Sequence, residues 1–341
     1  TPQRGKRVAF PFREPSYGKG TTMPDSVNCK LLANEVALIR QFQAISITPR
    51  KALRFNSPPG PELNNLFFLS VNDVTYAGRK LLTHSYERGC YQSSCLKPSQ
   101  LLGQLLSMAY TDHGLAVHFI SLEDTQRHDL FNAAVQHPDS EVYFPFPLLD
   151  STGQECTLSQ EQWACTPQLA GQLDNDEQHF RDYCAFFLQT MIQPGMVIYD
   201  PACSTGTFIG SLAQAFPEAH CIGSDQSATM IEHARNRFPA LVFKHMDAGL
   251  TQLASLCDVL ILRFLNAEVI HRDDAHCVFK HMVNTLKPGA MLIVFGHTPV
   301  LINVRNRAQA LGLRLISSLA ARPGHTELFE FYVMKKPSMH N

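Results

Sequence analysis

The second half of the chain alternates between short apolar runs and stretches whose apolar residues recur at helical spacing. The apolar runs predict strands at residues 196–199, 221–223, 241–244, 259–263, 291–295, 313–319 and 328–334. The patterns between them predict helices at residues 174–192, 207–216, 228–238, 274–286 and 301–311. Such alternation is typical of a parallel sheet with helices on both faces, and the last two strands predict an antiparallel hairpin at its edge. We therefore expect an α/β fold with a doubly wound, mostly parallel, seven-stranded sheet.

The first half of the chain is less regular and predicts a mainly helical region. Apolar residues recur at helix spacing from Ser26 to Ile39 and again over residues 99–110, and a strand is expected at residues 115–122. Residues 137–170 are rich in proline and polar residues, which predicts a long ordered loop. The expected organisation is a tail or arm at residues 1–25, a mainly helical N-terminal cover or substrate region at 26–173, and the regular α/β domain at 174–341.

Composition excludes several classes of protein. The chain has 341 residues, of which 45% are hydrophobic, and its formal net charge of -1 lacks the broad positive footprint of a nucleic-acid binder. No apolar run approaches the roughly 20 residues of a membrane helix, and no signal-peptide pattern begins the chain. The 10 cysteines include no C-x-x-C pair and the 15 histidines are scattered, so no bound metal is predicted. We expect a cytoplasmic protein whose partner is a small molecule; the oligomeric state is left open.

A turn rich in small residues follows the first strand of the α/β domain. It runs from Asp200 to Gly206 with the sequence DPACSTG, and Asp225 ends the next strand. Open parallel sheets bind ligands at such strand-to-helix turns, because small residues admit the ligand and the helix N-terminus offers free N–H groups. An acid at the end of the second strand can accept both hydroxyls of a ribose. A capping aspartate in an ordinary turn explains each residue alone, but the ordered set favours ligand binding.

With these features, residues 190–336 resemble the class I S-adenosylmethionine (SAM)-dependent methyltransferase family. The turn is similar to the family's D-x-G-x-G-x-G motif, with Ala202 and Ser204 where glycines are usual. Asp225 matches the acid that binds ribose, and Asp247 matches the acid near the adenine amino group. The resemblance implies SAM as substrate or co-substrate, with Asp200 and Ser204 near its methionine portion. The expected SAM-binding residues are Asp200, Ala202, Ser204, Gly206, Asp225, Gln226, Asp247, Ala248 and Arg263.

Three segments carry a narrower resemblance. The turn at 200–206, the sequence RFLNAEV at 263–269 and the sequence FGHTP at 295–299 are similar to the branch containing isonocardicin synthase and azetidine-2-carboxylate synthase. This resemblance implies attack on the γ-carbon of the methionine chain and release of methylthioadenosine. The nucleophile is then the α-amine of the same molecule, which closes a four-membered ring, or an external acceptor. We favour ring closure, because a cyclase needs no acceptor pocket; transfer of the 3-amino-3-carboxypropyl group and ordinary small-molecule methyl transfer remain alternatives.

Candidate catalytic residues lie just beyond the predicted strands. Asn266 can hold the amine or acceptor, and Glu268 can take a proton or orient Arg263, although an acid there can equally stabilise a helix dipole. His297 follows the next strand, where a structural role is favoured over a base or substrate contact. Ser204 can bond the ligand or cap the helix, and we favour ligand contact because glycine is the family norm.

Aromatic residues complete the predicted set. Aromatic faces attract a sulfonium cation, and low polarity favours the unprotonated amine needed for attack. Three aromatic residues lie in the predicted loop, and Tyr183 lies on the helix before the first strand. Such residues usually pack in a core, and we weigh that role evenly against contact of at least one of them with the sulfonium. The catalytic candidates are Asn266, Ser204, Tyr143, Phe144, Phe146, Tyr183, Glu268 and His297.

Overall fold

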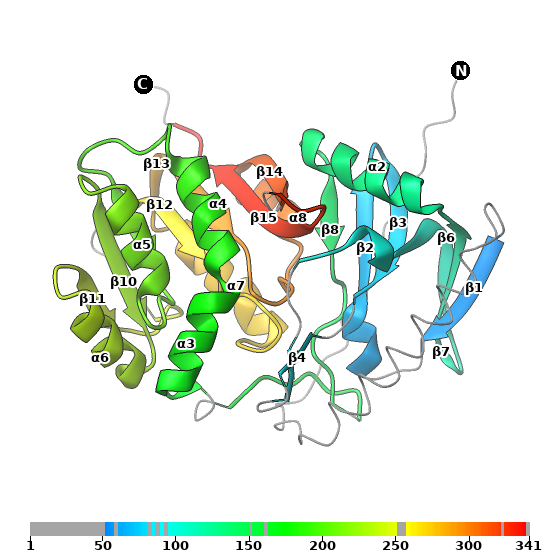
Figure 1. The fold of residues 1–341 in the computed structure, drawn as a ribbon, viewed down its shortest axis with the longest axis horizontal. Helices are drawn as coiled ribbons and strands as arrows, with labels where there is room; N and C mark the ends of the chain where they lie inside the picture. Colours follow the sequence, from blue (N-terminus) through cyan, green and yellow to red (C-terminus); the bar gives the residue numbers. More distant parts are fainter. Residues whose placement is uncertain are drawn as a thin grey trace. The chain divides into compact units, whose positions relative to one another are not determined.

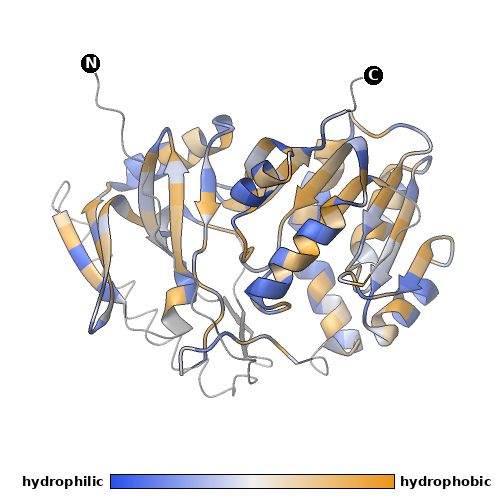
Figure 2. Cartoon of the chain, turned by 180° about the vertical axis from the view of Figure 1, so that it is seen from behind, coloured by the Kyte–Doolittle hydropathy of each residue, from blue (hydrophilic) through white to orange (hydrophobic). Residues whose placement is uncertain are grey.

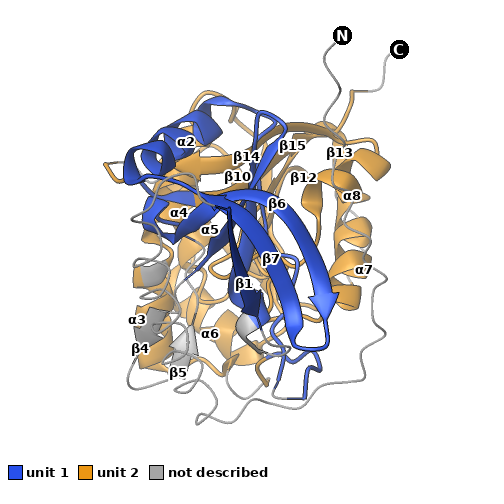
Figure 3. Cartoon of the chain, turned by 90° about the vertical axis from the view of Figure 1, so that its right-hand side faces the viewer, with its two compact units in different colours: residues 1–157, 326–328 blue, residues 158–325, 329–341 orange. Residues whose placement is uncertain are grey.

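The computed structural model describes residues 52–57, 61–80, 83–85, 89–91, 95–150, 152–159, 163–250, 257–321 and 324–338. The predicted tail at residues 1–25 and the predicted helix from Ser26 lie outside the described residues. Two compact units make up the chain (Figure 3): unit 1 comprises residues 1–157 and 326–328, and unit 2 comprises residues 158–325 and 329–341. The division between Thr157 and Leu158 precedes the boundary expected after residue 173.

Unit 2 contains the predicted seven-stranded sheet (Figure 1). Its spatial order is β11-β10-β9-β12-β13-β15-β14. The first five of these strands pair in parallel, and β15 pairs with β13 antiparallel, so the mostly parallel sheet is confirmed. The strands are β9 (Val197–Asp200), β10 (His220–Asp225), β11 (Val242–His245), β12 (Cys257–Leu262), β13 (Leu286–Val294), β14 (Arg314–Ala321) and β15 (Leu328–Lys335).

Helices cover both faces of this sheet. They are α3 (Pro167–Asp176), α4 (Gln178–Leu188), α5 (Thr207–Ala215), α6 (Ala228–Arg237), α7 (Arg272–Val283) and α8 (Val304–Ala310). On one face, Val294 of β13 belongs to a core cluster with residues of α7 and α8. The next residue, Phe295, points the other way and stacks on Phe180 of α4, with ring centroids 4.8 Å apart. Figure 2 shows the hydrophobic strands of this sheet beneath helices that carry both polar and apolar residues.

Two predicted helices of this unit need correction. The helix expected at 174–192 is broken at Glu177, which ends α3 and begins α4. The helix expected at 274–286 ends at Val283, and residues 286–289 already belong to β13.

The order of the strands fixes where a ligand binds. From β9 the chain moves outward to β10 and β11, and it then returns to place β12 on the other side of β9. Ligands of open α/β sheets bind at such a reversal, beyond the carboxyl ends of the strands. Asp200 ends β9 and Arg263 directly follows β12, so both lie at this edge.

Unit 1 is built on a second sheet. Its order is β1-β7-β6-β3-β2-β8, and the pairings between these strands are antiparallel. The strands are β1 (Ala52–Ser57), β2 (Leu66–Val71), β3 (Val74–Arg79), β6 (Leu101–Thr111), β7 (Gly114–Ser121) and β8 (Glu141–Tyr143). A helix, α2 (Asp124–Gln136), two short 3-10 helices (Pro61–Asn65 and Pro98–Gln100) and a strand pair, β4 (Thr83–Ser85) with β5 (Gly89–Tyr91), complete its described elements.

The prediction of a mainly helical cover is therefore wrong for the described part of unit 1. Residues 99–110, expected as a helix, form most of β6, while the expected strand at 115–122 is confirmed as β7. Gly103 allows the close approach of β6 to β7, because an added Cβ would lie 2.0 Å from the Ile120 carbonyl oxygen. The loop expected at 137–170 contains β8 and the start of α3. No helix within the described residues is long and apolar enough to cross a membrane.

Candidate functional site

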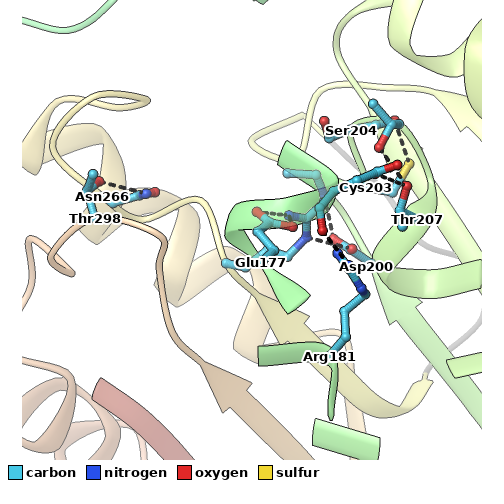
Figure 4. Close-up of polar contacts among 12 residues, drawn as sticks. Glu177, Arg181, Asp200, Cys203, Ser204, Thr207, Asn266 and Thr298 are labelled. Carbon is cyan, nitrogen blue, oxygen red and sulfur yellow. Dashed lines mark hydrogen bonds and ion pairs between the residues drawn. The ribbon is translucent and has the colours of Figure 1, made fainter. Parts of the chain in front are cut away.

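A buried charge network lies at the ligand edge of the unit 2 sheet (Figure 4). The Arg263 Nε–H donates to Oδ2 of Asp200 at 2.9 Å, and Nη1 donates to both carboxylate oxygens of Glu177 at 2.7 and 2.8 Å. The side chain of Asp200 is 0% exposed, that of Arg263 is 7% exposed and that of Glu177 is 11% exposed. The guanidinium also lies 5.4 Å from the centroid of the Phe208 ring. Three elements distant in sequence, the α3–α4 junction, β9 and β12, are thus joined by charge-assisted hydrogen bonds.

Burial and charge shift the titration of these groups in defined directions. Desolvation raises the pKa values of Glu177 and Asp200, and the neighbouring Arg263 guanidinium partly opposes this. Burial alone would lower the pKa of Arg263, but the two carboxylates outweigh it and raise that pKa, so the guanidinium stays charged. Desolvation also raises the pKa of Asp225, against the hydrogen bonds from two backbone N–H groups. The cation is therefore fixed, and the carboxylates are the groups that respond to pH.

The turn after β9 brings Ser204 to Asp225. The Ser204 backbone N–H donates to Asp225 Oδ2 at 2.9 Å, and the Ser227 backbone N–H donates to Oδ1 at 2.8 Å. Ser204 has a φ of 52°, in the left-handed region that side-chain-bearing residues rarely occupy. Within the described part of the chain, its hydroxyl meets one weak acceptor, the Met230 sulfur, at 3.6 Å. The strain and the weakly bonded hydroxyl favour a ligand contact for Ser204 over simple helix capping.

Gly206 has a packing role instead. Its φ is 78°, and an added Cβ would lie 2.8 Å from the Cβ of Ala234 in α6. The glycine therefore lets α5 begin against α6.

The carboxylate of Asp225 has room for further hydrogen-bond donors. It accepts one backbone N–H on each oxygen, which leaves two of about four acceptor positions. The side chain is partly exposed at the end of β10, beside the turn that carries Ser204. Two hydroxyls of a ribose can therefore bond to a carboxylate that the backbone already orients.

A second anchor holds the N-terminus of α5. Asp174 of α3 accepts a hydrogen bond from the Thr207 hydroxyl, and its other oxygen accepts one from Nη1 of Arg237 at 2.6 Å. Arg237 Nη1 also donates to the Thr207 hydroxyl at 2.9 Å. Asp174 and Glu177 lie three residues apart, on the same side of one helical turn. Asp174 therefore bonds to the start of α5 while Glu177 bonds to Arg263.

Asn266 lies beyond β12 in a buried position. Its residue is 2% exposed, and its Nδ2 donates to the Thr298 hydroxyl at 2.9 Å. Its Oδ1 is buried and accepts no hydrogen bond from any described residue. The loop after β13 approaches closely here, since a Cβ on Gly296 would lie 3.4 Å from the Asn266 side chain and 2.4 Å from the Thr298 carbonyl oxygen. Thr298 was not among the residues predicted from the sequence. Its hydroxyl accepts the hydrogen bond from Nδ2 of Asn266, which fixes the side-chain amide so that Oδ1 remains available as an acceptor.

The other predicted binding residues occupy varied positions. Ala202 donates its backbone N–H to Asp200 at 3.2 Å, whereas Ala248 is a core residue under α7. Asp247 is exposed after β11 and accepts the Gly249 backbone N–H at 2.7 Å. Gln226 is exposed, and its carbonyl oxygen lies 2.9 Å from Nε2 of His245. The turns after β10 and β11 are therefore adjacent, as the adenine and ribose assignments expect.

Two further catalytic candidates, Glu268 and His297, lie beyond β12 and β13. Glu268 is half-buried and its carbonyl oxygen accepts the Leu158 backbone N–H at 2.9 Å. The carboxylates that bond to Arg263 in this network are those of Asp200 and Glu177, and a role of Glu268 in orienting Arg263 or taking a proton stays a prediction. His297 is half-buried between Gly296 and Thr298 in the loop after β13.

The aromatic candidates lie in two different units. In unit 1, Phe144 packs on Phe67 with centroids 5.6 Å apart, and Phe146 belongs to the core cluster of the sheet. Tyr143 ends β8 opposite Phe68. In unit 2, the ring of Tyr183 lies 4.8 Å from that of Phe331. Packing accounts for Phe144 and Phe146, and contact of any of the four with a sulfonium stays a prediction.

Sequence reasoning missed Glu177, which is central to the network. It lies in a polar stretch, DNDEQ, that is typical of an exposed helical turn. A signal was available, because an arginine expected at a buried strand end requires a carboxylate partner. Among the described residues, no group of three or more metal-ligating side chains is positioned to hold a metal ion.

Comparisons with known proteins find similarity to methyltransferases and to one synthase. Residues 198–289 match the family model described as a methyltransferase domain. The chain is 29% identical over 283 residues to isonocardicin synthase from Nocardia uniformis subsp. tsuyamanensis, covering 80% of this chain and 91% of the relative. It is 33% identical over 97 residues to trans-aconitate 2-methyltransferase from Escherichia coli O1:K1 / APEC, covering 28% of this chain and 37% of that protein. Among solved structures, the N-methyltransferase NodS from Bradyrhizobium japonicum WM9 aligns with a TM-score of 0.39 and 16% identity, covering 48% of this chain and 97% of that one.

Proposed function

Because this chain is a SAM-dependent enzyme with a class I methyltransferase domain, we propose that it attacks the γ-carbon of SAM and releases methylthioadenosine. The leading form of the proposal is ring closure by the α-amine of the same molecule, which yields azetidine-2-carboxylate. The extent of similarity to isonocardicin synthase, 91% of that protein's length, supports a place in the branch that uses this carbon.

The available Oδ1 of Asn266 is the observation that carries the proposal. A buried carbonyl oxygen without a donor costs free energy, and a bound N–H group removes that cost. Asn266 follows β12, at the edge where the amino-acid arm of SAM is expected. An amine held there by Oδ1 is restrained in direction, and such restraint is what selects one electrophilic carbon of a sulfonium over the other two.

The reaction can be written so that atoms and charges balance. The α-ammonium first loses a proton to solvent, and the nitrogen lone pair then forms a bond to the γ-carbon. The γ-carbon–sulfur bond breaks, and its electron pair passes to sulfur to give methylthioadenosine. The nitrogen gains positive charge as the ring closes, so its N–H bond to Asn266 Oδ1 strengthens toward the transition state and lowers the barrier.

The remaining residues supply binding. Asp225 is oriented to accept the ribose hydroxyls, and the hydroxyl of Ser204 is available to the methionine portion. That the N-terminal region covers the substrate stays a prediction from the sequence. Transfer of the 3-amino-3-carboxypropyl group to an external acceptor is the second candidate, because isonocardicin synthase is a relative over 80% of this chain.

Product analysis of a reaction with enzyme and SAM alone tests the proposal. We expect methylthioadenosine and an equimolar four-membered cyclic amino acid. Methylthioadenosine that forms only after a small-molecule acceptor is added supports group transfer instead. Stoichiometric S-adenosylhomocysteine with a methylated acceptor contradicts the γ-carbon proposal in both forms.

A further inference from the structure

Glu177 introduces a charge that the rest of the site does not balance. Asp200 and Arg263 alone would form a neutral buried pair, and Glu177 adds a second carboxylate to the same guanidinium. Both carboxylates are almost fully removed from water, with side-chain exposures of 0% for Asp200 and 11% for Glu177. Charges in such surroundings are weakly screened by solvent and act on a nearby ligand.

The neighbouring charged groups do not remove this imbalance. Asp174 and Arg181 face Glu177 from α3 and α4, Asp200 and Asp225 lie at the ends of β9 and β10, and Arg263 follows β12. Arg237 pairs with Asp174 at 2.6 Å, and Nη2 of Arg181 bonds to the Gln178 side chain and the Asp174 carbonyl oxygen. Together with Asp182, which also acts on Arg181, the groups comprise five carboxylates (Asp174, Glu177, Asp182, Asp200, Asp225) and three guanidiniums (Arg181, Arg237, Arg263), so their formal net charge is 5 - 3 negative, or -2.

We propose that the buried charge of Glu177 makes this edge of the sheet more negative and thereby selects the cationic substrate over its uncharged products. SAM carries an ammonium, a sulfonium and a carboxylate, and hence a net charge of +1. Methylthioadenosine is neutral, azetidine-2-carboxylate is a zwitterion, and the remaining positive charge leaves as a proton. This inference rests on the proposed binding of SAM at this edge. It does not depend on which carbon of SAM is attacked, because S-adenosylhomocysteine, the product of methyl transfer, is also net neutral.

Glu177 is a positioning residue in this account, because it acts through charge and through its hold on Arg263. Binding of two stable ligands measures the selection directly. S-adenosylhomocysteine has a neutral thioether, whereas sinefungin carries an ammonium group in place of the sulfonium. Isothermal calorimetry at pH 8 gives the ratio of their dissociation constants, and we expect the wild-type protein to prefer sinefungin.

The Glu177→Gln variant keeps the shape of the side chain and removes its charge. We expect it to reduce the preference for sinefungin about tenfold, as loss of one weakly screened charge implies. Glu177→Asp keeps the charge and should retain most of the preference. The matched control is Asp182→Asn on α4, an exposed carboxylate that bonds to Gln178, and its ratio should equal that of the wild type. A ratio for folded Glu177→Gln within twofold of the wild type overturns the inference.

A second measurement uses the wild-type protein and covers the case in which Glu177→Gln does not fold. Burial raises the pKa values of Glu177 and Asp200, so in a titration downward from pH 8, as far as the protein stays folded, these carboxyl groups take up protons before ordinary surface carboxylates do. The preference for sinefungin should therefore fall with pH, and a constant ratio over this range contradicts the inference. Product identity is a separate readout: S-adenosylhomocysteine as the product refutes γ-carbon attack without affecting the charge selection.

Discussion

Replacing Asn266 by alanine should separate catalysis from stability. The substitution removes the bond from Nδ2 to the Thr298 hydroxyl, which is 2.9 Å long, and it removes the buried Oδ1 that accepts nothing from the described residues. Loss of a neutral buried hydrogen bond costs about 0.5–1.5 kcal/mol, while loss of an unsatisfied buried acceptor returns about 1–3 kcal/mol. The two effects oppose each other, so the free energy of unfolding should change by no more than about 1–2 kcal/mol.

The effect of the same substitution on turnover should be much larger. In the proposed reaction Oδ1 accepts an N–H whose nitrogen gains positive charge, and hydrogen bonds to charged groups contribute about 1.5–3 kcal/mol. This free energy corresponds to about a 10- to 150-fold loss of kcat. Affinity for S-adenosylhomocysteine should change less, because Asp225 and the turn after β9 still bind the nucleoside.

The assay is the rate of methylthioadenosine release at saturating SAM, with chemical denaturation as the measure of stability. Asn303→Ala is the matched control, because Asn303 caps α8 by accepting the Asn306 backbone N–H at 3.0 Å. That control should lose about 1 kcal/mol of stability and keep its turnover. Turnover of Asn266→Ala within twofold of the wild type refutes a role for Oδ1 in the reaction.

Three further predictions concern binding and stability. Asp225→Ala should weaken S-adenosylhomocysteine binding by about tenfold or more, since a carboxylate that accepts two hydroxyls is lost; unchanged affinity by calorimetry contradicts the ribose assignment. Gly206→Ala should destabilise the protein more than Gly312→Ala, because both have positive φ (78° and 74°) but only the former Cβ meets a neighbour, at 2.8 Å; equal melting temperatures contradict this. Phe295→Ala should cost about 3–5 kcal/mol in denaturant unfolding, because its ring is 1% exposed and stacked on two others; a loss below 1 kcal/mol contradicts the packing.

The unit 2 sheet could be predicted because its central strands contain nearly continuous apolar runs. Most of β12 and the last three residues of β13 are buried whichever face they point to, so these sequences cannot be confused with an exposed helix. The turn after β9 and Asp225 follow from that prediction, since parallel strands end at the same edge. This is why Ser204 and Asp225, which the structure joins by a hydrogen bond, could be named together from the sequence.

Unit 1 was predicted poorly because its strands are amphipathic and its turns were not recognised. Asn72 and Asp73 both have positive φ, at 50° and 62°, and they join β2 to β3 in a two-residue hairpin. The apolar residues of β6 recur at spacings that also suit a helix, and only pairing with β7 decides between the two. Phe144 and Phe146 then became core residues of a sheet that the sequence had not indicated.

Glu177 could not be predicted because its partner lies 86 residues away along the chain. Local sequence describes the turn between α3 and α4 as polar, and burial arises only when this turn packs against β9 and β12. The same reasoning explains Thr298, whose bond to Asn266 spans 32 residues. Interactions that orient the reacting groups therefore required the tertiary structure.

Isotopic labelling of SAM tests the central claim most directly. SAM carrying ¹³C in its methyl group and ¹⁵N in its α-amine is incubated with stoichiometric enzyme, and the products are identified by mass spectrometry. The proposal predicts that all ¹³C remains in methylthioadenosine and that ¹⁵N appears in the four-membered ring. Absence of methylthioadenosine, with ¹³C on another molecule and ¹⁵N in S-adenosylhomocysteine, would contradict attack at the γ-carbon.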